Sequence, residues 1–173
     1  MNGIVRKATA GTIMYQLQVC PCAGRRYRRE PNAQLPSMAV RILIADDDAS
    51  IRRLLRRLIE SHEGWTVCGD AHDGQDAIGK ATQLHPDIIV LDLAMPQMNG
   101  LQAARAISRQ NPELPMLLLT VQQVSKELTN EALHAGFKGA ISKSTGSEVV
   151  KAIEVLLQRQ SFFQPVRSDV FAW

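Results

Sequence analysis

The sequence lacks any long hydrophobic run, and this absence bears on membrane insertion. None of its apolar stretches approaches the roughly 18 residues that a membrane-spanning helix needs, so we expect no transmembrane helix. Hydrophobic residues still make up 45% of the 173 residues, which is enough to form a core. We therefore expect a folded cytoplasmic protein with no membrane partner.

Cysteine is scarce, with only Cys20, Cys22 and Cys68 present. An odd number of cysteines without a framework spacing argues against a secreted domain held together by disulfides. The Cys20-Pro21-Cys22 stretch offers two thiolates, but no second Cys or His pair accompanies them, which disfavours a zinc site. Cys68 lies in the strand-like run 65–68 and is interpreted as a small buried residue.

Most of the chain has no large excess of positive or negative charge. Residues 1–37 contain six Lys or Arg residues against the single acid Glu30, which leaves 14 basic and 16 acidic residues in the remainder. A body of that composition is not typical of a nucleic-acid-binding surface, so we predict no direct DNA binding. The first 37 residues show no sustained hydrophobic period and are expected to form a disordered basic extension. Its cluster 25–29 is typical of a nucleic-acid or membrane-surface arm, although a solvated tail, or a start codon assigned upstream of Met38, is favoured.

From Met38 onward, short apolar runs alternate with helical patterns. The runs predict five strands, at about 40–45, 65–71, 88–91, 116–120 and 139–142. The helical spacing predicts five helices, at about 51–59, 75–84, 101–110, 125–135 and 147–158. Such alternation indicates right-handed crossovers and a doubly wound α/β fold, whose parallel sheet is covered by helices on both faces.

The first helix has two distinct faces. Its predicted apolar stripe consists of Ile51, Leu54, Leu55, Leu58 and Ile59, and Ser50 is the expected N-cap. Four arginines at 52, 53, 56 and 57 lie on the other face. We interpret that face as solvated, and binding of an acidic partner is the alternative.

Polar residues follow four of the five predicted strands: Asp46 and Asp47, Asp92, Thr120 and Lys143. Since the carboxyl ends of parallel strands meet at one edge of a sheet, these side chains should converge. Crowded carboxylates repel one another, and a hard cation such as Mg²⁺ offsets that repulsion. A carboxylate oxygen of Asp92 is suited to attack a phosphorus atom, with Lys143 and Thr120 contacting the phosphoryl oxygens. Each residue alone could cap a helix or face solvent, but their joint position favours a site.

Four segments carry a resemblance to a known family: Ile-Leu-Ile-Ala-Asp-Asp at 42–47, Asp-Leu-Ala-Met-Pro-Gln-Met-Asn-Gly at 92–100, Leu-Leu-Leu-Thr at 117–120 and Gly-Ala-Ile-Ser-Lys at 139–143. In order and spacing they resemble the receiver domain of bacterial two-component response regulators, over about Val40–Gln158, and we expect the receiver domain to occupy 38–158. The resemblance implies a flavodoxin-like receiver fold, with five parallel strands in the order 2-1-3-4-5.

The resemblance also implies a role for each site residue. Asp92 would accept a phosphoryl group from a sensor histidine kinase or phosphotransfer protein. Asp47, Asp92 and the Ala94 backbone carbonyl would ligate Mg²⁺ directly, and Asp46 would act through a water molecule. Thr120 and Lys143 would contact the phosphoryl group, while Asp48 would be a secondary electrostatic contributor.

The expected output is signalling by protein–protein contacts rather than enzymatic turnover. The fourth helix, fifth strand and fifth helix would form the output face, through which a homodimer is also expected. Two departures from the family pattern bear on this output: Ala140 replaces the usual aromatic residue three positions before the lysine, and Ser144 replaces the proline that often follows it.

Three alternatives remain. The tail 159–173 contains Ser161–Pro165, which resembles the linker before a helix-turn-helix domain, so the chain could be a truncated DNA-binding transcriptional regulator. A phosphatase with an Asp nucleophile typically needs a second acid two residues later, where this chain has Ala94. A scaffold that no longer accepts phosphate is disfavoured by the complete set of acids, threonine and lysine.

Overall fold

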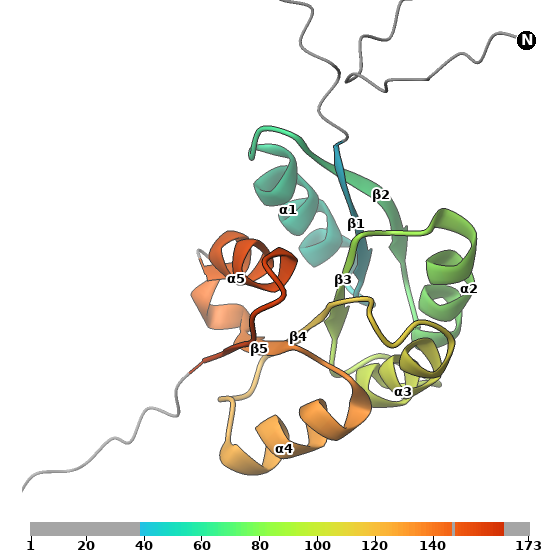
Figure 1. Cartoon of the computed structure of the whole chain (residues 1–173), viewed down its shortest axis with the longest axis vertical. Helices are drawn as coiled ribbons and strands as arrows, with labels where there is room; N and C mark the ends of the chain where they lie inside the picture. Colours follow the sequence, from blue (N-terminus) through green and yellow to red (C-terminus); the bar gives the residue numbers. More distant parts are fainter. Residues whose placement is uncertain (1–38, 147, 165–173) are drawn as a thin grey trace, which may run out of the picture. The chain divides into compact units, whose positions relative to one another are not determined.

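A parallel sheet between two layers of helices makes up most of the described residues (Figure 1). The computed structural model describes residues 39–146 and 148–164. The elements are β1 Val40–Ala45, α1 Ala49–Glu60, β2 Trp65–Ala71, α2 Gly74–Leu84, β3 Ile88–Asp92, α3 Gly100–Gln110, β4 Met116–Thr120, α4 Lys126–Ala135, β5 Gly139–Ser142, the short 3₁₀ helix η1 Lys143–Thr145, α5 Glu148–Leu157 and β6 Phe162–Phe163. The predictions for residues 1–37, including Cys20 and Cys22, and for the tail from Pro165 onward lie outside the described residues.

The strand order is β2-β1-β3-β4-β5-β6, and every neighbouring pair is parallel. This confirms the predicted α/β fold and its order 2-1-3-4-5. The prediction of five strands missed β6, which pairs with β5 at the edge of the sheet. Two residues are too short to show a hydrophobic period, so Phe162 and Phe163 gave no strand signal in the sequence.

Alternation along the strands builds a core on each side of the sheet. Leu43, Leu91 and Leu118 lie in the cluster covered by α2, α3 and α4. Ile42 and Val90 point the other way, into the cluster covered by α1 and α5. All five positions of β3 and of β4 are buried, as expected for central strands of a sheet covered on both faces. Each fully buried aliphatic side chain contributes about 1.5–3 kcal/mol to stability.

Two details of the first helix differ from the predictions. Asp48, not Ser50, is the N-cap, because its Oδ1 accepts a hydrogen bond of 2.6 Å from the Ser50 backbone N–H. Asp and Ser are both favourable N-caps. Only three residues separate the end of β1 at Ala45 from the start of α1 at Ala49, so the cap position falls on Asp48. The predicted apolar stripe holds for Leu55 and Ile59, which are buried, but is wrong for Leu54, whose exposed fraction is 62%.

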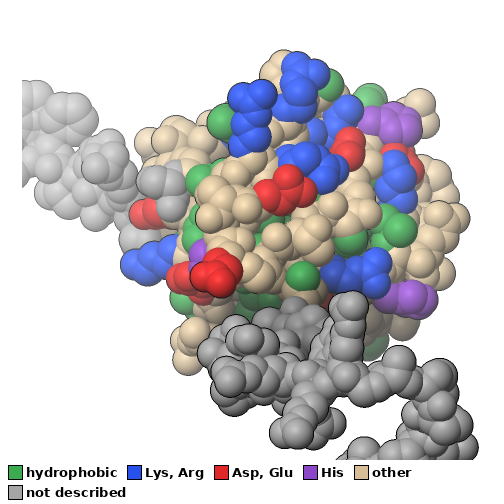
Figure 2. All heavy atoms as spheres, turned by 90° about the horizontal axis from the view of Figure 1, so that it is seen from above, with side chains coloured by type: hydrophobic (Ala, Val, Ile, Leu, Met, Phe, Trp, Pro, Cys, Tyr) green, Lys and Arg blue, Asp and Glu red, His purple; other side chains and the backbone are tan. Residues whose placement is uncertain are grey.

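The surface of the described residues mixes charges of both signs. Figure 2 shows basic side chains gathered over part of one face, with acidic ones among them and hydrophobic ones in small separate areas. The large hydrophobic side chains exposed in the described part of the chain are Leu54, Val121 and Leu133. No helix within residues 39–146 and 148–164 has the length and apolarity needed to span a membrane.

Candidate functional site

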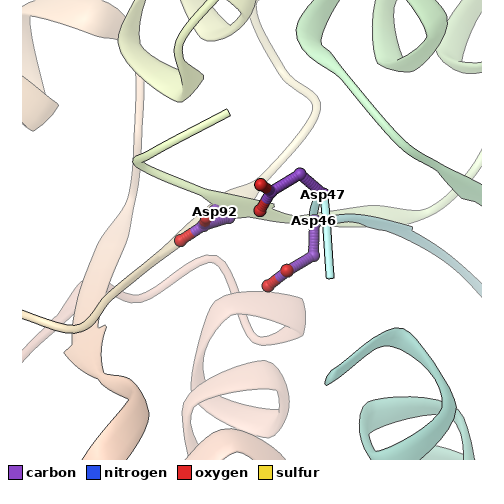
Figure 3. Close-up of side chains that lie close together, drawn as sticks. All are labelled: Asp46, Asp47 and Asp92. Atoms are coloured by element: carbon purple, nitrogen blue, oxygen red, sulfur yellow. The ribbon is translucent and has the colours of Figure 1, made fainter. Parts of the chain in front are cut away.

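Three carboxylates meet where β1 and β3 end (Figure 3). Asp46 follows β1 directly and Asp92 is the last residue of β3, and these two strands are paired in the sheet. Ligand oxygens of Asp46, Asp47 and Asp92 all lie within 4.8 Å of one another. Asp46 and Asp92 are buried, whereas Asp47 is exposed at the mouth. The structure therefore brings the predicted acids together at the carboxyl edge of the sheet.

Lys143 adds the balancing positive charge. It begins η1 directly after β5, and its Nζ lies 2.7 Å from Asp46 Oδ2 and 2.9 Å from Asp92 Oδ1. Burial on its own lowers the pKa of Lys143, but the two carboxylates outweigh burial and raise that pKa, so the amine is charged. A single ammonium group thus contacts two of the three clustered carboxylates.

The pKa of Asp92 reflects the same crowding. Burial raises it, the nearby Lys143 ammonium lowers it, and the neighbouring charges of Asp46 and Asp47 raise it further. The net result is a pKa above the usual value for an aspartate. A divalent cation among these carboxylates would reverse that effect by favouring their ionised forms.

The residues present fit a hard cation. Asp46 Oδ1 accepts a hydrogen bond of 3.0 Å from the Asp48 backbone N–H, whereas Oδ2 is buried and has the Lys143 ammonium, at 2.7 Å, as its ion-pair partner. A buried oxygen of this kind beside two further carboxylates suits Mg²⁺, which takes oxygen ligands and retains several waters.

Thr120 lies between the acids and the lysine. It is the last residue of β4, next to β3 on one side and β5 on the other, with Ser142 as its register partner. The side chain is buried, and its Oγ1 accepts a hydrogen bond of 3.1 Å from the Gln122 backbone N–H. The hydroxyl proton is not used in that hydrogen bond and is available to a further acceptor.

The loop after β3 returns closely onto the strand end. Gly100 begins α3, and its N–H donates to the Leu93 carbonyl at 3.0 Å. A Cβ at this position would collide with the carbonyl oxygen of Asp92, so only glycine permits the approach. The loop that is closed in this way contains Ala94, which is exposed two residues beyond Asp92.

Arg52 is a residue whose role the sequence did not reveal. Its Nη1 donates to the carbonyls of Asp46 and Asp47, at 2.7 and 3.0 Å, and its Nε contacts Asp70 at 3.2 Å. Arg56 also binds Asp70, at 2.8 Å. The predicted solvated face of α1 is therefore wrong for these two arginines. Arg52 fixes the backbone that presents the acids, a contact that helical spacing alone does not signal.

The two departures from the family pattern also have a structural setting. Ala140 is fully buried, and its register partner on β6 is Phe163, which packs against the same core cluster. Ser144 lies in η1, where its backbone N–H approaches Ser142 Oγ at 3.4 Å. A proline has no N–H to make that contact.

Comparison with known proteins places this fold and site in a family. The family model described as "Response regulator receiver domain" matches residues 42–154. The chain belongs to this family. The match includes both strand ends that supply the acids, as well as Thr120 and Lys143.

Individual relatives are identical to this chain at about a third of the aligned positions. The "Transcriptional regulatory protein YdfI" of Bacillus subtilis is 37% identical over 64% of this chain and 51% of its own length. A "Protein-glutamate methylesterase/protein-glutamine glutaminase" of Pyrococcus abyssi is 36% identical over 65% of this chain and 31% of its own. The crystal structure of a LuxR-family two-component response regulator from Aurantimonas sp. SI85-9A1 has a TM-score of 0.70 and 33% identity, covering 73% of this chain and 91% of that one. The chain thus spans about half of the first curated relative and about a third of the second, which are similar to it only in part.

Proposed function

We propose that this receiver accepts a phosphoryl group on Asp92 from a sensor histidine kinase or a phosphotransfer protein. The observation that carries the proposal is the contact of Lys143 Nζ with both Asp46 and Asp92, inside a group of three convergent carboxylates. A lone acid at a strand end could be a cap or a turn former. A buried pair that shares one ammonium, beside a third carboxylate, is suited to phosphate and cation chemistry.

The transfer needs no general base, because the ionised carboxylate is already the nucleophile. An Asp92 oxygen attacks the phosphorus atom of a phosphohistidine, the new P–O bond forms an acyl phosphate, and the P–N bond breaks with its electron pair passing to the imidazole. Lys143 places its positive charge beside the incoming phosphoryl oxygens. Thr120 donates its hydroxyl proton to another of those oxygens.

Mg²⁺ bound at this site offsets the repulsion between the carboxylate and the phosphoryl group. Asp47, Asp92 and the Ala94 carbonyl are the proposed direct ligands, and Asp46 contributes through water. Direct ligation by Asp47 is supported by its exposed carboxylate, which lies close to those of Asp46 and Asp92. Asp46 is fully buried and paired with Lys143, which suits an indirect role.

The proposed output is a change in protein–protein contacts at the α4–β5–α5 face, without turnover of a substrate and without direct DNA binding. Phosphorylation would favour one of two states of the domain, and a homodimer through this face is part of the proposal. Lys143 supports this location, because it joins Asp92 to the segment between β5 and α5. A cytoplasmic location stays a prediction.

A DNA-binding regulator that lacks its output domain here is the second candidate. The observation that favours it is the match to YdfI, a transcriptional regulatory protein of which this chain covers 51%. A reading frame that continues past Trp173 into a helix-turn-helix, and a sequence-selective gel shift by the longer product, would support this candidate.

Intact mass after incubation with acetyl phosphate tests the main proposal. With Mg²⁺ we expect one added phosphoryl mass, located on Asp92 by fragmentation, and with excess chelator we expect almost none. Equal labelling with and without the metal, or a phosphoryl group on another residue, would contradict the proposed site.

A further inference from the structure

Strand β6 lies against β5 through a small set of specific contacts. The backbone N–H of Phe162 donates to the Lys138 carbonyl and that of Gln164 to the Ala140 carbonyl, both at 2.9 Å. Gly139 allows this approach, because a Cβ there would lie 2.5 Å from the Phe162 carbonyl oxygen. These hydrogen bonds place Gln164 beside the end of β5, close to Ser142, which directly precedes Lys143.

The rings of β6 pack on both sides of the sheet. Phe162 contacts the cluster under α1 and α5, and Phe163 contacts the cluster under α2, α3 and α4. The segment is therefore anchored by side chains as well as by backbone hydrogen bonds. These contacts also hold the backbone of Gln164, the next residue, beside β5.

The Gln164 side chain binds both ends of the turn that contains Lys143. Its Oε1 accepts a hydrogen bond of 2.9 Å from the Ser142 backbone N–H, and its Nε2 donates to Thr145 Oγ1 at 3.3 Å. Thr145 Oγ1 in turn donates to the Ser142 carbonyl at 2.8 Å. Lys143 therefore lies inside a turn that Gln164 joins at both ends.

We propose that Gln164 is a positioning residue for phosphoryl transfer, holding the Ser142–Thr145 turn so that Lys143 Nζ stays between Asp46 and Asp92. This inference rests on the proposed role of Asp92. Gln164 lies outside residues 42–154, which the family model matches, so its role belongs to the segment that follows α5 in this chain.

The physical reason lies in the lysine side chain. Lysine has a flexible four-carbon stem, so the position of its charge depends on how firmly its backbone is fixed. A side-chain amide that binds two points of a three-residue 3₁₀ helix restricts that backbone. Replacing the amide with a methyl group leaves the Ser142 N–H without its partner and lets the turn move.

Two readouts on the full chain test the inference, with Gln164→Ala as the variant and Gln160→Ala, an exposed glutamine of the same tail, as the control. The first is amide hydrogen exchange of Ser142 and its neighbours in the turn. The second is the initial rate of phosphorylation by acetyl phosphate with Mg²⁺. In Gln164→Ala we expect faster exchange at Ser142 and a rate lower by about 2- to 10-fold, the worth of roughly one net hydrogen bond. Gln160→Ala should match the unmodified chain in both.

The same substitution in a Lys143→Ala background separates positioning from general destabilisation. If Gln164 acts through Lys143, adding Gln164→Ala to Lys143→Ala leaves the rate unchanged. A further fall by the same factor as in the unmodified background would show that Gln164 only stabilises the fold, and would overturn the proposal.

The outcomes also separate this inference from the proposed function. An unmodified chain that takes no phosphoryl group on Asp92 would refute the proposed function, and the inference would fall with it. A chain that is phosphorylated equally fast with and without Gln164 would refute the inference alone. Unchanged exchange at Ser142 in Gln164→Ala would also refute it, whatever the phosphorylation result.

Discussion

Lys143 Nζ lies 2.9 Å from Asp92 Oδ1, and this ion pair joins the end of β5 to the end of β3 across the intervening strand β4. The same nitrogen contacts Asp46 Oδ2 at 2.7 Å. One side chain thus connects the proposed phosphoacceptor to the edge of the sheet where β6 binds. A short chain of contacts therefore connects Asp92 to the β5–α5 segment.

Asp47 and Asp48 are adjacent acids with different predicted effects. Asp47→Ala should greatly weaken Mg²⁺ binding, because Asp47 belongs to the carboxylate group that could hold the ion. Asp48→Ala should leave the affinity nearly unchanged and lower the thermal midpoint, because Asp48 caps α1. Titration calorimetry is the suitable measurement. Tryptophan fluorescence is less suitable, because Trp65 starts β2 beside Val40, at the far end of β1 from the acids. Equal loss of affinity in the two variants would contradict this assignment of the acids.

Ala140 has little room for a larger side chain. It is fully buried, and β6 lies directly beside it. Ala140→Tyr, which would restore the aromatic residue common in the family, should destabilise the fold by about 1–3 kcal/mol through overpacking. Denaturant unfolding measures this change, with Lys151→Tyr on the exposed face of α5 as a control that should cost far less. A variant as stable as the unmodified chain would show that the site can open to accept a ring.

A pH-dependent contribution to stability is expected from Asp76 in α2. Burial raises its pKa, but the hydrogen bonds from Lys80 Nζ at 2.7 Å and the His72 backbone N–H at 3.3 Å outweigh burial and hold that pKa below the usual value. Because the folded-state pKa is lowered, the contribution is complete above the unfolded value, about 4, and is lost as the pH falls through the folded value.

The thermal midpoint of Asp76→Asn should therefore lie below that of the unmodified chain at pH 7, and the two should approach each other as the pH is lowered from 7 through the folded-state pKa of Asp76. Glu131→Gln, which changes an exposed acid on α4, is the control and should show a much smaller difference at pH 7. A gap between Asp76→Asn and the unmodified chain that is constant across this pH range would contradict the predicted linkage.

Sequence patterns predicted most of the fold because each pattern matches a physical requirement. The strands alternate between two buried faces, and the polar residues that follow them converge because parallel strands end at one edge. Asp46, Asp47, Asp92, Thr120 and Lys143 were found in this way. Their assembly in space agrees with the prediction, while their chemical roles await experiment.

Contacts between segments distant in sequence could not be predicted. In the sequence, Arg52 is one of four arginines on the polar face of a helix. Only the folded chain shows that it binds the Asp46 and Asp47 carbonyls. Gln164 lies in a short segment without hydrophobic periodicity. The sequence therefore predicted neither β6 nor the hydrogen bonds of the Gln164 side chain to Ser142 and Thr145. The choice of Asp48 over Ser50 as N-cap depends on one turn of backbone, which residue preferences do not determine.

The most direct test of the account is phosphorylation of Asp92→Asn, which keeps the shape of the side chain and removes the nucleophilic carboxylate. Asp87→Asn, directly before the opposite end of β3, is the matched control. After incubation with acetyl phosphate and Mg²⁺, intact mass should show one phosphoryl group on the unmodified chain and on Asp87→Asn, and none on Asp92→Asn. A full phosphoryl adduct on Asp92→Asn would contradict the central claim that Asp92 is the phosphoacceptor.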